Sequence, residues 1–317
     1  MSETTTWPCV IVGGGAAGLS AALVLGRARR RVLLLDAGEQ SNLAAHGIGG
    51  LLGHDGLPPA ELYARGRAEL AAYGTVTVRD ARVVAGERDG DGFALTLQDG
   101  ERVAAGHVVL AVGMRYRLPE LPGLAELWGG AAFHCPYCHG WEARDGRLAV
   151  LGPEAATHRA LLLRGWSDDV VLLTDGPAGL DADELRALER AGVRVDERPV
   201  AALEREGDAL RAVRFADGAE LERDGIMVVA PLGLRDDVAT GLGATLTERG
   251  TVDADPFCRT VVPGLFAAGD VSAMAPQVAA AIAQGSLAAA MVNDAIVAAE
   301  HGRAPMVPPR EVAAPAV

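Results

Sequence analysis

Residues His134 to Gly140 have the sequence HCPYCHG, which places two thiols and two imidazoles within seven positions near the middle of the chain. Cysteines spaced as Cys-x-x-Cys can close and reopen a small disulfide, and a neighbouring imidazolium or helix N-terminus lowers the pKa of such thiols. Pro136 suits the first position of a helix, where no backbone N–H is needed and the helix dipole favours a thiolate. The segment therefore predicts a redox-active dithiol, Cys135 and Cys138, at a helix start.

His134 and His139 flank this pair, and imidazoles ordinarily titrate at about 6.5, a value suited to taking and returning thiol protons. His139 is the first candidate for this base and His134 the second. The same residues allow two other interpretations. Two cysteines and two histidines could ligate zinc, although zinc sites usually take ligand pairs from separated segments. A purely structural disulfide is also possible, although so short a loop gains little stability from it. We expect the redox role, and no bound metal.

The chain has 317 residues, enough for about two domains with a proper core. Its 42 acidic residues outnumber 29 basic ones, all of them arginine, and the formal net charge is −13. This balance argues against a nucleic-acid surface and against acidic partners. The start, MSETTTWP, lacks the features of a signal peptide, so we expect a cytoplasmic protein. We also expect no membrane segment, because the apolar tract from Val278 to Val292 is short and interrupted by polar residues.

The run CVIVGGGAAGLSAALVLGR predicts a buried strand, a turn and a helix, with Gly13, Gly15 and Gly18 in the G-x-G-x-x-G positions of a dinucleotide fingerprint. The first glycine permits the turn, the second lets the backbone approach a pyrophosphate, and the third lets the helix lie close to the strand. The pyrophosphate would rest on the helix N-terminus. The next strand ends at Asp36, whose carboxylate can accept the hydroxyls of a ribose. Together these features predict a dinucleotide site.

A second strand, turn and helix, GRLAVLGPEAATHRALLLRGW, repeats this layout without its chemistry. Counting from Gly152, Glu154 and Thr157 occupy the second and third glycine positions. Pro153 also removes an N–H. A carboxylate and a Cβ would therefore stand where a pyrophosphate must approach. The strand that follows ends at Asp175, with no arginine pair to hold a 2′-phosphate. We expect a nucleotide-binding fold without a working NADPH site.

Between the two repeats, alternating strands with Asp-Gly turns predict a small antiparallel sheet, and residues 117–123, RLPELPG, predict a domain crossing. The later run TVVPGLFAAGDVS predicts a strand that returns to the first nucleotide site before a long helix. A glycine-rich loop from His46 to Gly56 carries His54 and Asp55. This loop could lie near a bound cofactor, or it could be a solvated loop with polar turn residues.

The first glycine motif with Asp36, the AVG of residues 111–113, the central Cys-x-x-Cys and VPGLFAAGD together resemble the low-molecular-weight thioredoxin reductases, over nearly the whole chain. The resemblance implies an α/β protein with two Rossmann-like, three-layer ββα nucleotide-binding domains. It implies an FAD-binding domain made of residues 1–117 and 246–317, and an inserted, degenerate NAD(P)H-binding-like domain of residues 118–245 that carries the dithiol. It also implies a homodimer.

The same resemblance implies which residues would bind FAD. Asp270 would contact its ribityl or phosphate region, and Gln277 would face the flavin pyrimidine. The full expected set is Gly13, Gly15, Ala16, Ala17, Gly18, Asp36, Ala37, Gly38, Asn42, Gly113, Gly269, Asp270, Gln277 and Val278.

Two departures from those reductases indicate different chemistry. The reductases carry an acidic residue after the second cysteine, where this chain has His139, and they keep both NADPH motifs. The form HCPYCHGWE, with DAGEQSN earlier, is similar to the dithiol oxidases that close the disulfides of holomycin and gliotoxin in natural-product (antibiotic) pathways. This likeness implies an FAD-dependent oxidase that forms an intramolecular disulfide in a small-molecule dithiol, with O2 as the acceptor and H2O2 as the product.

In such an enzyme a substrate thiolate attacks Cys135 of the oxidised pair, and the second substrate thiol resolves the mixed disulfide. The resemblance places Cys138 nearer the flavin. An alternative function is a thioredoxin or other disulfide reductase that draws electrons from NAD(P)H or a ferredoxin-like protein. Another is a flavin-binding scaffold or redox sensor without turnover. No motif identifies the dithiol.

Overall fold

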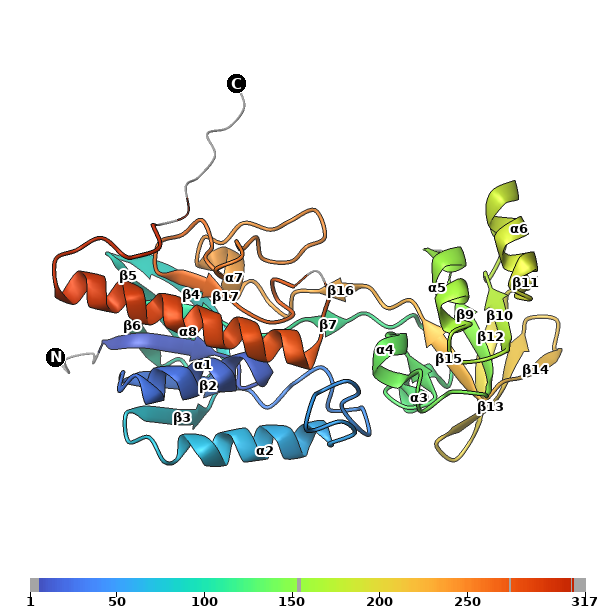
Figure 1. Ribbon diagram of the computed structural model, residues 1–317, viewed down its shortest axis with the longest axis horizontal. Coiled ribbons are helices and arrows are strands. Elements are labelled where there is room, and N and C mark those ends of the chain that lie inside the picture. The colour runs from blue at the N-terminus through green and yellow to red at the C-terminus, as the bar shows by residue number, and fades with distance from the viewer. Residues whose placement is uncertain (1–5, 153–154, 274, 309, 311–317) are drawn as a thin grey trace, which may run out of the picture. The chain divides into compact units, whose positions relative to one another are not determined.

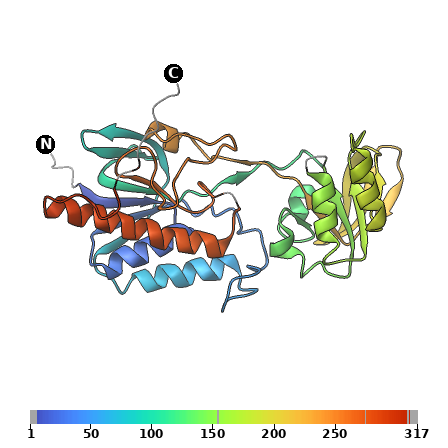
Figure 2. The same ribbon diagram turned by 45° about the horizontal axis from the view of Figure 1, so that its top comes forward.

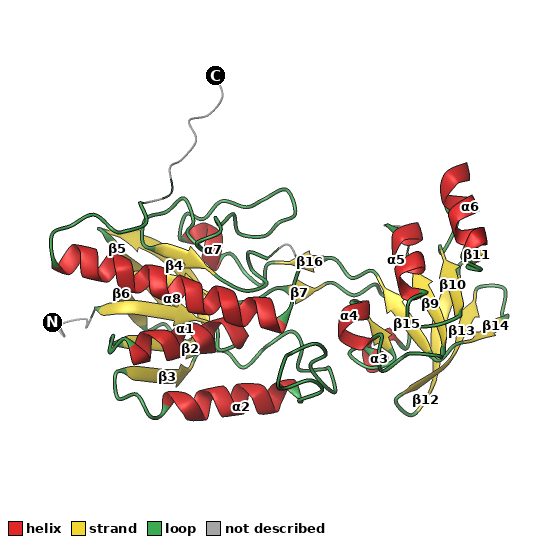
Figure 3. Cartoon of the chain, in the orientation of Figure 1, coloured by secondary structure: helices red, strands yellow, loops and turns green. Residues whose placement is uncertain are grey.

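The computed structural model describes residues 6–152, 155–273, 275–308 and 310. The chain divides into two compact units, one made of residues 1–41, 60–115 and 232–317 and the other of residues 42–59 and 116–231. Each unit contains a parallel sheet, an antiparallel group of strands and helices (Figure 1; Figure 3). The chain is therefore an α/β protein, as the sequence predicted.

The sheet of the first unit has the strand order β3-β2-β1-β6-β5-β4, and β17 also pairs with β6. β1, β2, β3, β6 and β17 run parallel, whereas β4, β5 and β6 are antiparallel neighbours. β6 belongs to both groups, because its first half pairs with β5 and its second half with β17. The strands are Trp7–Val12 (β1), Val32–Asp36 (β2), Val76–Asp80 (β3), Val83–Asp89 (β4), Gly92–Leu97 (β5), Arg102–Leu110 (β6) and Leu265–Ala267 (β17).

The antiparallel sheet expected from the alternating strands is therefore smaller than the pattern suggested. β3 was expected within it but lies parallel to β2, with Val32 opposite Val76. The alternation of apolar and polar residues along β3 shows only that one face of the strand is covered. A strand at the edge of a parallel sheet can have the same pattern, so the pattern does not distinguish the two kinds of pairing. Only β4, β5 and the first half of β6 form the antiparallel layer.

The helices of the first unit, within the described residues, are Ala16–Arg27 (α1), Pro59–Leu70 (α2), Val238–Gly241 (α7) and Val278–Glu300 (α8). α1 and α8 lie side by side (Figure 1; Figure 2). Gly285 permits this approach, because a Cβ there would lie 2.0 Å from the carbonyl oxygen of Ala17. The end of the chain thus returns to the first glycine motif, in agreement with the sequence prediction.

α8 is longer than the apolar tract seen in the sequence. Its 23 residues are long and apolar enough, by length and composition, to cross a membrane, with a mean hydropathy of 1.3 in the tested window. The argument that the tract is too short to span a bilayer is therefore wrong. In this fold Ala281, Ala288 and Val292 of α8 are buried in the core of the first unit, which includes α1.

The second unit has a parallel sheet with the strand order β11-β10-β9-β15-β8 and a separate antiparallel sheet β12-β13-β14. The parallel strands are Ala132–Phe133 (β8), Arg147–Leu151 (β9), Asp169–Leu173 (β10), Arg194–Asp196 (β11) and Gly225–Val228 (β15), and the antiparallel ones are Val200–Glu206 (β12), Ala209–Phe215 (β13) and Glu220–Glu222 (β14). The helices are Leu124–Leu127 (α3), Pro136–His139 (α4), Ala156–Leu163 (α5) and Ala182–Arg190 (α6).

The chain passes between the units through two short strands, Arg115–Tyr116 (β7) and Leu232–Gly233 (β16), which pair with each other. The first crossing lies close to the expected position, but the second falls after residue 231 rather than after residue 245. The reason is that Val238, Leu242 and Ala244 are buried in the core of the first unit. Residues 42–59, expected in the FAD-binding domain, are grouped with the second unit.

Candidate active site

The two cysteines of the Cys-x-x-Cys motif lie where β8 leads into α4. Cys135 is the extended residue before the helix and Pro136 is its first residue, as the sequence predicted. Both thiols are half-buried, and Cys138 Sγ lies 2.8 Å from Cys135 Sγ. Because a disulfide bond is about 2.05 Å long, a small movement suffices to join the two sulfurs. The arrangement suits a pair that alternates between dithiol and disulfide.

α4 is a single turn, which changes one part of the prediction. The carbonyl oxygen of Cys135 accepts the N–H groups of Cys138 and His139, both at 3.2 Å, and the Gly140 N–H closes the turn on Pro136 at 2.6 Å. A helix dipole is the sum of many aligned peptide groups, so four residues produce only a weak one. The expected stabilisation of a thiolate by the dipole is therefore not supported, and the neighbouring imidazoles become the main candidates for it.

The ring of His139 is enclosed by protein. It stacks on Phe133, with centroids 5.7 Å apart and planes 14° apart, and neither buried nitrogen has a hydrogen-bond partner among the described residues. Burial lowers the pKa of His139. The carboxylate of Glu142 opposes this shift, as do the backbone carbonyls of Gly129 and Cys135, which approach the ring without hydrogen-bond geometry. The imidazole is therefore mainly neutral at pH 7 and can accept a proton.

His134 has different surroundings. Its Nδ1 lies 3.3 Å from the carbonyl oxygen of Val228 and 3.4 Å from the backbone nitrogen of Ala230, and its ring is 5.5 Å from that of Tyr116. Nδ1 therefore faces the backbone just after β15, which supports His139 as the first candidate for the thiol base. In the described part of the chain, no group of three or more His, Cys, Asp or Glu side chains is arranged to hold a metal ion.

Residues 42–59 pack on the dithiol turn, which the sequence did not indicate. A Cβ at Gly49 would lie 2.7 Å from the carbonyl oxygen of Cys138, and a Cβ at Gly129 would lie 2.6 Å from the carbonyl carbon of Ala44. Glycine at both positions permits this close approach of two backbone segments. The glycines of the loop were visible in the sequence, but a contact between segments so distant along the chain has no local signature.

Within this loop, the polar residues singled out from the sequence have structural surroundings. Asp55 Oδ1 accepts the N–H of Gly50 at 2.8 Å, and His54 is exposed. The interpretation of a solvated loop is therefore the better one for His54. Another histidine, His46, is exposed next to the dithiol turn, with its Cε1 3.5 Å from the position that a Cβ at Gly130 would take.

The first glycine motif has the geometry that the sequence predicted. Gly13, with φ 108°, makes the turn between β1 and α1, and a Cβ at Gly18 would lie 1.8 Å from the carbonyl oxygen of Gly13. Gly15 differs, because a Cβ there would meet only Gln40 Cγ, at 3.5 Å. No side chain caps α1 at Gly15, so the N–H groups of its first turn are available to a ligand. Two glycines are thus required by the fold, and the middle one keeps a space open.

Asp36 lies at the end of β2 and is only 5% exposed. Its Oδ1 accepts the N–H groups of Gly14 at 3.2 Å and Gly38 at 3.0 Å, and Gln40 Nε2 approaches at 3.1 Å. Its Oδ2 accepts from the Arg67 guanidinium at 2.7 Å. The sequence predicted a ribose acceptor, and the structure adds a second role, because this carboxylate ties the glycine turn to α2.

The C-terminal part of the first unit brings further expected residues to this turn. The Gly269 N–H donates to Gln284 Oε1 at 2.8 Å, and a Cβ at Gly269 would lie 3.0 Å from Ala17 Cβ. Burial raises the pKa of Asp270, and Arg235 opposes this shift. Sequence patterns did not indicate Arg235, which donates to the carbonyl of Val112 at 3.1 Å and to Ser41 Oγ at 2.8 Å.

The other expected cofactor residues are divided between the units. Gln277 immediately precedes α8, which begins at Val278, and Gly113 has the positive φ of 64°. Ala16 and Ala17 begin α1, and Ala37 follows β2. Asn42 begins the segment that is grouped with the second unit, and it is therefore the one expected residue not placed in the first unit.

The chain matches the family model of the pyridine nucleotide-disulphide oxidoreductases over residues 7–285. It belongs to this family.

Two curated relatives cover nearly the whole chain. Thioredoxin reductase tcpT of Claviceps purpurea is 32% identical over 97% of this chain and 100% of its own length. Thioredoxin reductase sirT of Leptosphaeria maculans is 31% identical over 90% of this chain and 92% of its own length. The crystal structure of HlmI is 39% identical, with a TM-score of 0.90 over 95% of this chain and 96% of that one. The crystal structure of an oxidoreductase from Agrobacterium tumefaciens is 36% identical, with a TM-score of 0.87 over 92% of this chain and 99% of that one.

This pyridine nucleotide-disulphide oxidoreductase has the thioredoxin reductase-like fold with Rossmann-type domains, and the predicted fold class is confirmed. Such proteins typically depend on a flavin, and the residues of the first unit fit one. Gly15 leaves open the space that a Cβ would fill, the first turn of α1 presents N–H groups, and Asp270 is a half-buried acid with a raised pKa. The pKa is raised because burial outweighs the opposing charge of Arg235, and a ligand hydroxyl could satisfy such a group.

The difference between Gly15 and Gly18 gives a test of the cofactor site. We expect Gly15→Ala to fold normally, because the added Cβ meets only an ordinary contact at 3.5 Å, but to lose bound flavin, because it fills the space beside the turn. The apoprotein should keep its melting temperature while the purified protein loses its 450 nm absorbance. Gly74→Ala, where nothing lies within 4 Å, is the control that should keep both. Full flavin content in Gly15→Ala would contradict this assignment.

The second glycine turn of this oxidoreductase shares the positive φ of its first glycine, Gly152, with the first turn but differs at the positions that follow. Pro153 and Glu154, which carried part of the sequence argument, lie outside the described residues. Thr157, in the third glycine position, is in α5 and only 9% exposed. The Asp175 carboxylate accepts the backbone N–H of Val200 at 2.7 Å and so serves the local fold. These placements agree with the expectation of an inactive NADPH site, which remains a prediction.

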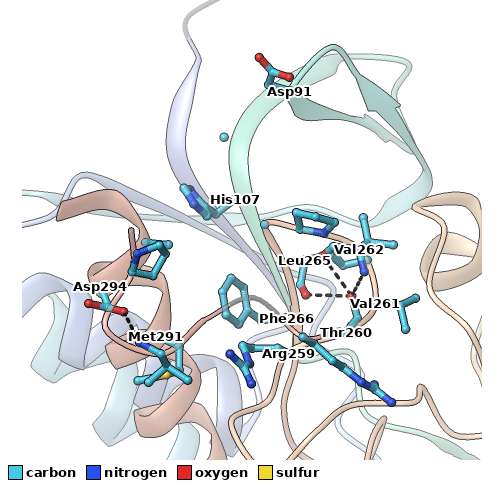
Figure 4. Close-up of a pocket in the computed structure, with 17 residues that line it drawn as sticks. Asp91, His107, Arg259, Thr260, Val261, Val262, Leu265, Phe266, Met291 and Asp294 are labelled. Atoms are coloured by element: carbon cyan, nitrogen blue, oxygen red, sulfur yellow. Dashed lines mark hydrogen bonds between the residues drawn. The ribbon is translucent and has the colours of Figure 1, made fainter. Parts of the chain in front are cut away.

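The first unit also has a cavity of about 300 Å³, formed by segments around β6, β17 and α8 and by the chain after α8 (Figure 4). Apolar side chains such as Phe266 and Met291 line it together with His107 and Asp294. Asp294 Oδ2 accepts the N–H of Val307 at 3.4 Å, which holds the final segment over the helix. The lining contains neither the glycine motif nor the cysteines, so this cavity is separate from both sites.

Proposed function

We propose that this protein is an FAD-dependent dithiol oxidase that forms an intramolecular disulfide in a small-molecule dithiol and passes the electrons to O2, giving H2O2. The proposal depends on one observation above all: His139, an enclosed and mainly neutral base, follows Cys138 directly. The reductases that the sequence resembles carry an acid at this position. A neutral imidazole can deprotonate an incoming thiol, which a carboxylate of ordinary pKa does poorly.

The residues of the second unit perform the thiol chemistry. His139 accepts the proton of a substrate thiol, and the resulting thiolate attacks Cys135 Sγ of the Cys135–Cys138 disulfide. The bond between the two cysteine sulfurs breaks, a mixed disulfide forms at Cys135, and Cys138 leaves as a thiolate. The second substrate thiolate then attacks the substrate sulfur of the mixed disulfide and releases Cys135. The substrate has become a disulfide and the protein a dithiol, so the two electrons now reside on the protein.

A bound FAD would supply the two-electron acceptor that returns the cysteine pair to a disulfide and allows reduction of O2 to H2O2. The glycine turn, Asp36 and Asp270 would hold it. The overall balance is one dithiol and one O2 consumed for each disulfide and each H2O2 formed, and no further reductant is required.

A disulfide reductase is the second candidate, and the names of tcpT and sirT as thioredoxin reductases favour it. A reductase needs an electron donor. Thr157 stands in the third glycine position and Asp175 is an acid where a 2′-phosphate would need a cation, which counts against NADPH as that donor.

An oxygen electrode separates the two candidates. With purified holoprotein and dithiothreitol in air, we expect O2 uptake, and equal amounts of H2O2 and oxidised dithiothreitol, without any nicotinamide. A reductase would show this uptake only weakly and would instead consume NADPH in the presence of a disulfide. Absence of dithiol-dependent O2 uptake across a panel of small dithiols would contradict the proposal.

A further inference from the structure

We propose that His46 is the residue through which His139 exchanges its proton with solvent during thiol oxidation. This inference rests on the proposed function, because it concerns the proton that a substrate thiol releases. His46 acts through His139, and it is therefore a positioning and relay residue of the site.

The need for such a residue follows from the burial of His139. Both of its ring nitrogens are buried, and among the described residues neither has a hydrogen-bond partner. A base in this position can take a proton from a substrate that enters beside the cysteines, but it cannot pass that proton to bulk water by itself. A base must be regenerated in every turnover, so a second group near the ring is required.

His46 has the placement that this task requires. Its side chain is exposed, and its Cε1 and Nε2 lie 3.5 Å and 3.9 Å from the position that a Cβ at Gly130 would take. The carbonyl of the preceding residue, Gly129, approaches the ring of His139. One short turn, Gly129–Gly130, is thus close to both imidazoles. Repulsion from His46 also lowers the pKa of His139.

Two close backbone contacts hold His46 at this place. Ala44 packs on Gly129 and Gly49 packs on the carbonyl of Cys138, so the segment is fixed on both sides of His46 along the chain. The hairpin that follows is closed by the pairing of Ile48 with Leu57. The position of His46 is therefore set by packing, and its exposed ring can exchange protons with solvent.

Other ionisable groups around His139 are less suitable for the relay. Glu142 is exposed and its negative charge raises the pKa of His139, so this carboxylate stabilises the imidazolium and does not favour release of its proton. Cys135 and Cys138 are occupied by the sulfur chemistry. His134 directs its Nδ1 to the backbone near Val228. His46 is therefore the remaining imidazole near His139, and unlike His139 it is exposed to solvent.

The transfer is balanced without a further reactant. The S–H bond of the substrate breaks, its electron pair stays on sulfur as the thiolate, and the proton binds a His139 nitrogen. The imidazolium then gives a proton to His46, directly or through a water molecule, and His46 gives a proton to bulk water. No electron moves in this exchange.

The test compares His46→Gln with His54→Gln, a matched control in which an exposed histidine of the same loop is replaced. In dilute buffer without imidazole at pH 7, we expect His46→Gln to lower kcat for dithiothreitol oxidation by about 10-fold with little change in KM, because relay and not binding is impaired. His54→Gln should behave as wild type. Added imidazole should restore the kcat of His46→Gln and leave wild type unchanged.

These outcomes distinguish the inference from the proposed function. If wild-type protein oxidises no dithiol, the proposed function fails first. If wild type is active but His46→Gln has normal kcat, or a lowered kcat that imidazole does not restore, the relay is wrong. The relay is equally wrong if Glu142→Gln, and not His46→Gln, shows the loss and its rescue. Melting temperatures of all variants identify any loss that comes from misfolding, and His46→Asn then provides a second variant for the rescue measurement.

Discussion

Replacement of Cys135 by serine is expected to lower the rate of dithiol oxidation by about 1,000-fold or more, because a hydroxyl cannot form the disulfide through which electrons leave the substrate. Cys138→Ser should lower it as much. The two variants should fail at different steps. Cys138→Ser keeps Cys135, which can be trapped with substrate as a mixed disulfide. Cys135→Ser lacks the thiol that substrate attacks, so this adduct at position 135 should be absent.

Mass spectrometry after incubation with an oxidised small-molecule disulfide measures the adduct, and stopped-flow turnover measures the rate. Tyr137→Phe is the matched control, because Tyr137 lies between the two cysteines but is 64% exposed and should be replaceable without loss. If either serine variant kept most of its turnover, the relay through the cysteine pair would be wrong.

His139→Ala is expected to lower turnover at pH 7 by about 100-fold to 10,000-fold, the usual contribution of a general base. Part of this loss should be recovered near pH 9, because substrate thiols, which ordinarily titrate at about 8.5, then ionise unaided. Since alanine also removes the stack on Phe133, His139→Phe is the informative companion, which keeps a ring there and removes the base. His158→Ala, at an exposed histidine of α5, is the control.

The pH profile of the wild type follows from the surroundings of the same ring. Burial lowers the pKa of His139, and the base is the neutral form, which exists above that pKa. Lowering the pKa therefore extends activity to lower pH, and the acid limb of kcat should lie below the ordinary value of about 6.5. An acid limb that persists unchanged in His139→Phe, or full activity of His139→Phe at pH 7, would assign the ring a purely structural role.

Local patterns predicted those parts of the fold that depend on neighbours in the sequence. The spacing of Gly13, Gly15 and Gly18 was sufficient to predict the strand, the turn and the helix, because the positive φ of Gly13 and the contact of Gly18 with Gly13 are local features of this turn. Pro136 likewise marked the start of α4. The return of the strand before Gly269 to the first nucleotide site was also expected, but the packing of α8 on α1, which Gly285 permits, is seen only in the structure.

Features that depend on tertiary packing could not be predicted in this way. The contact of Gly49 with Cys138 joins segments far apart in the chain, and the burial of Leu242 in the first unit moves a domain boundary without any local signal. The ion pair between Arg67 and Asp36 is of the same kind.

The most direct test of the central claim is anaerobic reduction of the purified yellow protein, followed by flavin absorbance at 450 nm in a stopped-flow instrument. We expect dithiothreitol to bleach the flavin rapidly, and admission of air to restore the colour with formation of H2O2. Micromolar NADPH should bleach the flavin slowly or not at all. Rapid bleaching by micromolar NADPH, together with slow or absent bleaching by dithiothreitol, would contradict a dithiol oxidase and would identify a nicotinamide-dependent reductase.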